Sequence, residues 1–118
     1  MAAHEEKLRR LAIHEERSVE LAVGGSDDET SPLSSRELGL VRLAALVAID
    51  GPATTFEWAA TRAAAAGASP DDIVAVLEAV APIVGSAVVV SASPKLALAV
   101  GYDLDADLEE RDGRRSGR

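Results

Sequence analysis

The residues best suited to chemistry lie close together, between Thr55 and Arg62. Trp58 and Arg62 are four residues apart, so on a helix they share a face and can stack. Together with Thr55 they predict a small pocket that binds a carboxylate ligand through Arg62. Glu57 and Arg62 are five apart and form a poor intrahelical pair. The alternative is that Trp58 anchors a core poor in aromatic residues and that Arg62 is solvated.

Arg42 is a further cation, and it lies within an otherwise apolar stretch. A charge in such a place is rarely buried without a partner. We expect an ion pair with Asp50, Glu57 or a neighbouring subunit, in preference to a substrate contact. As a cation near the predicted pocket, Arg42 stays a candidate ligand-binding residue.

The composition excludes several classes of function. The chain has 118 residues, enough for one domain, and a formal net charge of −8. Acidic charge repels phosphate backbones, so nucleic acid is not an expected partner. The chain contains no cysteine, which rules out disulfides, thiolate catalysis and cysteine metal ligands. This usage fits a reducing cytoplasm.

No metal site, cofactor site or membrane segment is predicted. His4 and His14 are ten residues apart, whereas ligand pairs on one helix sit three or four apart. The first ten residues lack the apolar core of a signal peptide. The longest uncharged run, residues 79–94, is shorter than the ~20 residues that span a bilayer. We expect it to be a buried helix or a subunit contact.

Start signals predict an all-α protein of about six helices. Ser34 and Thr54 each stand three residues before a glutamate, as in a capping box. Ser69 and Ser93 each precede a proline, which suits the first position of a helix. The predicted helices cover residues 3–23, 35–49, 55–66, 70–81, 83–92 and 94–100.

These helices divide the chain into three predicted segments. Residues 1–34 hold an N-terminal helix and a polar linker, residues 35–102 form the helical core, and residues 103–118 are a charged tail. The tail has too few apolar side chains to offset its ordering entropy, so we expect disorder there. The core is rich in alanine and valine, so close helix packing must replace bulky anchors.

The segment AAAAGASPDDI, with the tryptophan-containing helix before it and PKLALAVGYD after it, resembles the carboxymuconolactone decarboxylase family. That family includes the alkylhydroperoxidase-like proteins. Its redox members carry two cysteines and a histidine, and counting back from Gly67 places these at Pro52, Thr55 and Ala59 of this chain. None of these three can act as a thiol or move a proton at neutral pH. The resemblance therefore implies the alkylhydroperoxidase-like fold without thiol peroxidase activity.

The resemblance also implies site residues and an assembly. A glutamate in the first core helix of the family acts as a proton relay, and Glu37 could align with it; the alternative is that Glu37 only closes the capping box with Ser34. Family members form trimers and hexamers, so we expect a homo-oligomer.

Two functions follow as hypotheses. One is an enzyme or binding protein for a small carboxylate, with Glu37 and Glu57 as catalytic candidates beside Arg42 and Arg62. The other is a non-catalytic oligomeric interaction or scaffold module. The sequence leaves open whether any reaction is catalysed, because a fold does not fix a function.

Overall fold

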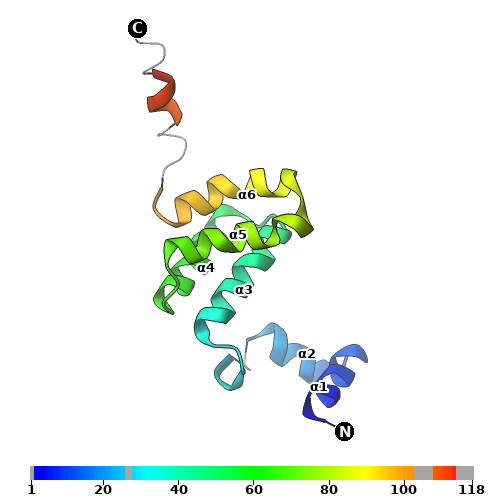
Figure 1. Cartoon of the computed structure of the whole chain (residues 1–118). Helices are drawn as coiled ribbons and strands as arrows, with labels where there is room; N and C mark the ends of the chain where they lie inside the picture. The colour runs from blue at the N-terminus through cyan, green and yellow to red at the C-terminus, as the bar shows by residue number, and fades with distance from the viewer. Residues whose placement is uncertain (1, 26–27, 103–107, 114–118) are drawn as a thin grey trace. The chain divides into compact units, whose positions relative to one another are not determined.

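The computed structural model describes residues 2–25, 28–102 and 108–113, and every regular element among them is helical (Figure 1). This confirms the all-α prediction. The elements are α1 (Ala3–Ala12), α2 (Glu16–Val23), the short 3-10 helix η1 (Asp28–Thr30), α3 (Ser35–Ala48), α4 (Ala53–Ala65), α5 (Pro70–Val84) and α6 (Ser86–Ala99). Residues 108–113 are helical too; the rest of the predicted disordered tail lies outside the described residues.

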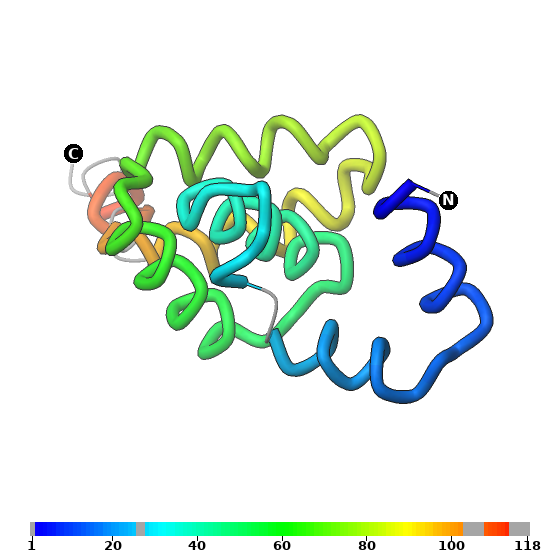
Figure 2. The backbone as a smooth tube through the Cα atoms, turned by 90° about the horizontal axis from the view of Figure 1, so that it is seen from below, coloured from blue at the N-terminus to red at the C-terminus, as the bar shows by residue number. Residues whose placement is uncertain are grey.

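The chain divides into two compact units, Met1–Pro32 and Leu33–Arg118. The division falls two residues before the predicted boundary at 34/35. In the first unit α1 packs against α2. In the second, each of four helices packs mainly against two neighbours, in the cyclic order α3, α4, α6, α5. Figure 2 shows the chain reversing direction between α5 and α6.

Small residues let the four helices of the second unit approach closely. A Cβ added at Gly39 of α3 would lie 3.0 Å from both Cα and Cβ of Ala63 in α4, closer than side-chain carbons normally come. Half of the buried core residues are alanines. The buried set is Leu43, Val47, Phe56, Ala59, Ala60, Ala63, Ala68, Ile73, Ala92 and Leu96.

Two of the predicted helix starts are capping boxes. The Ser34 hydroxyl accepts a hydrogen bond from the Glu37 N–H, and the Glu37 carboxylate accepts one from the Ser34 N–H. Ser69 and Asp72 make the same reciprocal pair at α5. Gly67, at φ +100°, makes the left-handed turn between α4 and α5. Few residues other than glycine adopt that φ without strain.

Two predicted breaks at proline were wrong. Helix α5 continues through Pro82 to Val84 and ends at Gly85, which has φ +85° and ψ 169°. Pro82 is exposed near the helix end, so the single carbonyl that it leaves unbonded can face water. Helix α6 likewise continues through Pro94. The Ser93 hydroxyl donates to the Val89 carbonyl at 2.7 Å, so it bonds backward within α6 and caps no new helix.

The predicted helix over residues 3–23 was also wrong. His14 adopts the left-handed region, at φ +57°, and Glu15 is extended, so α1 ends and α2 begins anew. The break lets α1 and α2 pack against each other, which one straight helix cannot do. Thr54 is not a cap either. Helix α4 begins at Ala53, two residues before the predicted start at residue 55, with Pro52 in the cap position and no side-chain cap.

Candidate functional site

Helix α4 presents Trp58 and Arg62 on the face opposite its buried side. Phe56, Ala59 and Ala63 point into the core, whereas Trp58 is 57% exposed. The expectation that Trp58 anchors the core is therefore wrong. The predicted stacking with Arg62 is correct: the guanidinium carbon lies 4.9 Å from the indole centroid, within the range of a cation–π contact.

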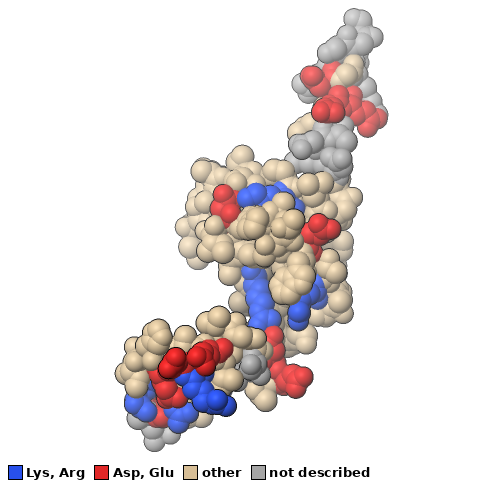
Figure 3. All heavy atoms as spheres, turned by 180° about the vertical axis from the view of Figure 1, so that it is seen from behind, with Lys and Arg blue, Asp and Glu red and all other residues tan. Residues whose placement is uncertain are grey.

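The Arg62 guanidinium keeps its hydrogen-bonding edge free. Among the described residues, no side chain forms an ion pair or a hydrogen bond with the Arg62 guanidinium, which stacks on the Trp58 ring. Guanidinium groups bind carboxylates through two parallel hydrogen bonds. In Figure 3, the Lys and Arg atoms of the α3–α6 bundle form separate groups on a largely uncharged surface, and one group lies beside Asp or Glu atoms. The pair can therefore recognise a carboxylate that arrives beside a flat apolar ring.

The remaining predicted ligand-binding residues do not enclose this pair. Thr55 is half-buried one turn before Trp58, and Arg42 is exposed on α3. Glu57 is exposed and forms no ion pair with Arg62; its carbonyl accepts a hydrogen bond from the Thr61 hydroxyl at 2.8 Å. Trp58 is 57% exposed, whereas the concave pockets that hold most small ligands bury most of the ligand surface.

Glu37 is held as a carboxylate by its capping box. The hydrogen bond from the Ser34 N–H, followed by that from the Ser34 hydroxyl, lowers the pKa of Glu37. A proton relay near neutral pH needs a raised pKa instead. The capping interpretation of Glu37 thus accounts for its geometry and its charge state.

The two predicted catalytic carboxylates lie far apart. Helices α3 and α4 are joined by only four residues, so they run antiparallel, and Gly39 meets Ala63 where they cross. Glu37 lies two residues from Gly39 on one side of this crossing, and Glu57 lies six residues from Ala63 on the other side. The two glutamates are therefore eight residues apart along the helix axes. At 1.5 Å per residue the separation along the axis is about 12 Å. They cannot act together on one small substrate.

The three positions that match the reactive residues of the redox family do not form a polar site. Pro52 is the exposed cap residue of α4, and Thr55 is half-buried. Ala59 is 4% exposed and belongs to the hydrophobic core. A methyl group packed among apolar side chains fills the position that the resemblance assigns to histidine.

A polar cluster that was not predicted from the sequence joins the α3–α4 turn to α6. Lys95 Nζ lies 2.9 Å from Asp50 Oδ1 and 3.0 Å from the Gly51 carbonyl oxygen, and the Ser91 hydroxyl donates to the same Asp50 oxygen at 2.9 Å. The hydrogen bond from Lys95 is the main cause of a lowered Asp50 pKa. Asp50 therefore pairs with Lys95 here. The four-residue spacing of Ser91 and Lys95, which places both side chains on one face of a helix, is the sequence feature that could have predicted this cluster.

A second missed ion pair joins the starts of α3 and α5. Arg36 Nη2 lies 3.0 Å from Asp72 Oδ1, across the two helices. The Ser69 N–H, then the Arg36 guanidinium, lower the pKa of Asp72. Both polar clusters thus fix helix ends, and each is already satisfied by its own partners.

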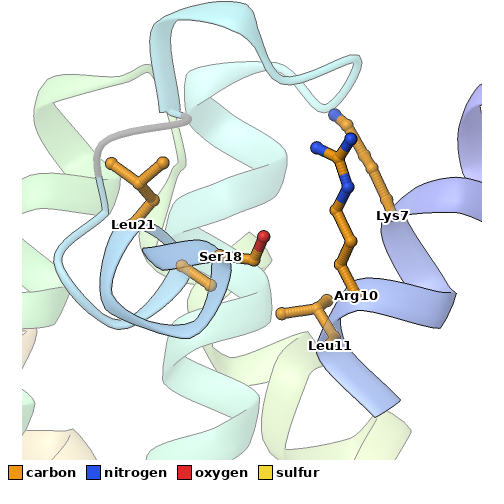
Figure 4. Close-up of a pocket in the computed structure, with 6 residues that line it drawn as sticks. Lys7, Arg10, Leu11, Ser18 and Leu21 are labelled. Carbon is orange, nitrogen blue, oxygen red and sulfur yellow. The ribbon is translucent and has the colours of Figure 1, made fainter. Parts of the chain in front are cut away.

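The first unit has a small hollow between α1 and α2, with a volume of about 210 Å³ (Figure 4). Leu11 and Leu21 supply apolar walls from the two helices, and Lys7 and Arg10 reach up on one side. Arg10 Nε is already bonded to Glu6 Oε1 at 2.9 Å. The single helix expected from the sequence could not have shown this hollow.

Comparison with protein-family models, with curated proteins and with solved structures gave no match to this chain. The resemblance described above therefore stays a hypothesis. Within the described part of the chain, no helix has both the length and the apolar content needed to cross a bilayer.

Proposed function

We propose that this chain is a non-catalytic, self-associating interaction module with a carboxymuconolactone decarboxylase-like fold and no thiol peroxidase activity. The core position of Ala59, the capping role of Glu37 and its distance from Glu57 all favour a module over an enzyme. The glycine turn at Gly67 and the capped start of α5 are compatible with the proposed fold. A cytoplasmic location belongs to the same proposal, because cysteine-free chains suit a reducing compartment.

The main observation in support of self-association is the apolar surface around the α5–α6 turn. Ile83 is 87% exposed before Gly85, and Val90 is 71% exposed after it. Transfer of a branched aliphatic side chain from water to an apolar contact is favourable. Exposed apolar patches therefore mark contact surfaces. We propose a closed homo-oligomer, a trimer or a hexamer, that covers this surface.

Light scattering on the full chain tests the proposal. Ile83→Asp would place a charge in the contact, so the assembly should dissociate while circular dichroism still reports a folded helical protein. Ala53→Asp is the matched control: it adds the same charge at an exposed first position of α4, where a carboxylate favours the helix. Self-association would be disproved if the wild-type chain stayed monomeric at every concentration up to about 100 μM, which is far above a micromolar dissociation constant.

The stacked Arg62 favours a second candidate function, recognition of a small carboxylate. Such a ligand would bind only the folded state and raise the melting temperature. A panel of carboxylic acids should then stabilise the wild type but not Arg62→Gln. If the acids raise the melting temperatures of the wild type and of Arg62→Gln equally, or raise neither, this candidate is dismissed.

A further inference from the structure

A groove lined by small side chains runs along α4 on a different side from Trp58. Its volume is about 260 Å³, and α4, α5 and α6 all contribute walls. An apolar cavity of about 150 Å³ already binds benzene, so this groove has room for an indole ring. Its lining residues are Ala60, Thr61, Ala64, Ala68, Pro70, Ile73, Ala99 and Val100.

Trp58 does not fill the groove of its own chain: it is 57% exposed, stacks on Arg62 and is not among the groove-lining residues. Successive residues turn about 100° around a helix, so Ala64 lies about 120° away from Trp58 on α4. The indole therefore projects from one side of α4 while the groove lies on another. A large exposed apolar ring and an apolar groove on separate faces can satisfy each other only between two copies.

The charges near the two surfaces are complementary. Arg62 stacks on Trp58 and has no carboxylate partner among the described residues. Asp71 directly follows the groove residue Pro70, is exposed, and likewise forms no ion pair within the described ranges. Its neighbour Asp72 is already held by Arg36 and Ser69. Asp71 is therefore the carboxylate left to receive an incoming guanidinium.

We propose that Trp58 of one copy seats in the alanine-lined groove of a second copy, where Arg62 of the first pairs with Asp71 of the second. This inference rests on the proposed self-association and adds a second contact to the one proposed at Ile83 and Val90. The two surfaces differ, so the contact is heterologous and repeats from copy to copy until a ring closes. The apolar residues Ile83 and Val90 remain available to join two such rings.

The fluorescence of the full chain gives a direct test, because Trp58 is the only tryptophan. Emission should be blue-shifted in the assembly, and on dilution it should move to the wavelength of a solvated indole as light scattering reports smaller particles. Arg62→Asp and Asp71→Arg should each weaken assembly at least about tenfold, since each sets like charges face to face. The double variant, which carries both changes, should recover most of that loss.

Two further variants separate the contact from general effects. Ala64→Leu would fill the groove from an exposed position of α4 and should block seating without any change of charge. Glu78→Gln changes an exposed charge on α5, eight residues and about 12 Å along the helix from Pro70, and should leave assembly unaltered. Solvated emission at concentrations where light scattering reports an oligomer would overturn this contact but leave self-association standing. A double variant as weak as the two single variants would also overturn it.

Discussion

Buried apolar packing stabilises the crossing of α3 and α4, whereas exposed ion pairs are the main contacts in the unit formed by α1 and α2. At the crossing, Gly39 and Ala63 let the backbones approach, and Leu43 and Phe56 are fully buried beside them. In the first unit no described helical residue is buried, and Leu8 is 64% exposed. Its clearest contacts are ion pairs from Glu6 to Arg9 and Arg10, all in solvent. Buried apolar area stabilises far more than exposed ion pairs do.

The largest expected effect comes from removing a core side chain. Leu43→Ala should lower the free energy of unfolding by about 2–5 kcal/mol, because it removes transfer free energy and leaves a cavity. Leu8→Ala is the matched change in α1 and should stay within about 0.5 kcal/mol. Urea denaturation followed by circular dichroism measures both. Equal losses would mean that the first unit is buried in the assembled protein.

A methyl group at the helix crossing should cost less. Gly39→Ala gains about 1 kcal/mol of helix propensity, but its Cβ would meet the Ala63 backbone at 3.0 Å. Because backbone cannot rotate away, we expect a net loss of about 1–3 kcal/mol in urea denaturation. Adding Ala63→Gly removes one of the two close contacts and should return part of this loss. A stabilised Gly39→Ala protein would contradict close packing at this point.

The Lys95–Asp50 pair should show itself in the pH dependence of stability. The Asp50 pKa is lowered in the folded protein, so its contribution is complete above the unfolded value of about 4 and is lost as pH falls through the lower folded value. Lys95→Met should make the unfolding midpoint less sensitive to pH in this acidic range. Thermal melts between pH 2 and about 5 test this, and parallel curves for both proteins would argue against it.

The smallest effect is expected in the first unit. Hydrogen bonds from Arg9 and then Arg10 lower the pKa of Glu6 to about 2, so its ion pairs weaken only as pH falls from about 4 towards that value. Glu6→Gln should reduce helical circular dichroism slightly and leave the urea midpoint of the α3–α6 core unchanged. About 1 M salt should have a similar effect on the wild type, because exposed ion pairs are screened. A shifted core midpoint would show that the two units are coupled.

Local signals predicted the helices where local chemistry decides them. Ser34 and Ser69 cap helices because a hydroxyl and a carboxylate within four residues satisfy the first backbone N–H groups. The same signals misled at Thr54 and Ser93, because each of these residues lies inside a helix that has already begun. Pro82 misled because it removes a single hydrogen bond close to the helix end, and the carbonyl left without it, that of the exposed residue Glu78, can bond to water.

The candidate site was only partly predictable. Four-residue spacing was enough to predict that Arg62 stacks on Trp58, since both partners lie on one helix. Spacing could not show that this pair faces solvent, that Ala59 packs in the core, or that Lys95 reaches Asp50 from α6. Each of these depends on residues tens of positions apart.

The sequence by itself determined the all-α class, the two serine caps and the lack of thiol chemistry, because each depends on composition or on neighbours within one helical turn. Tertiary structure alone decided which face of α4 is buried, where small residues let helices cross, and which charges pair between elements. Packing selects among faces that local propensity leaves equivalent, so Ala59, Ala60 and Ala63 of α4 turned inward and Trp58 turned outward.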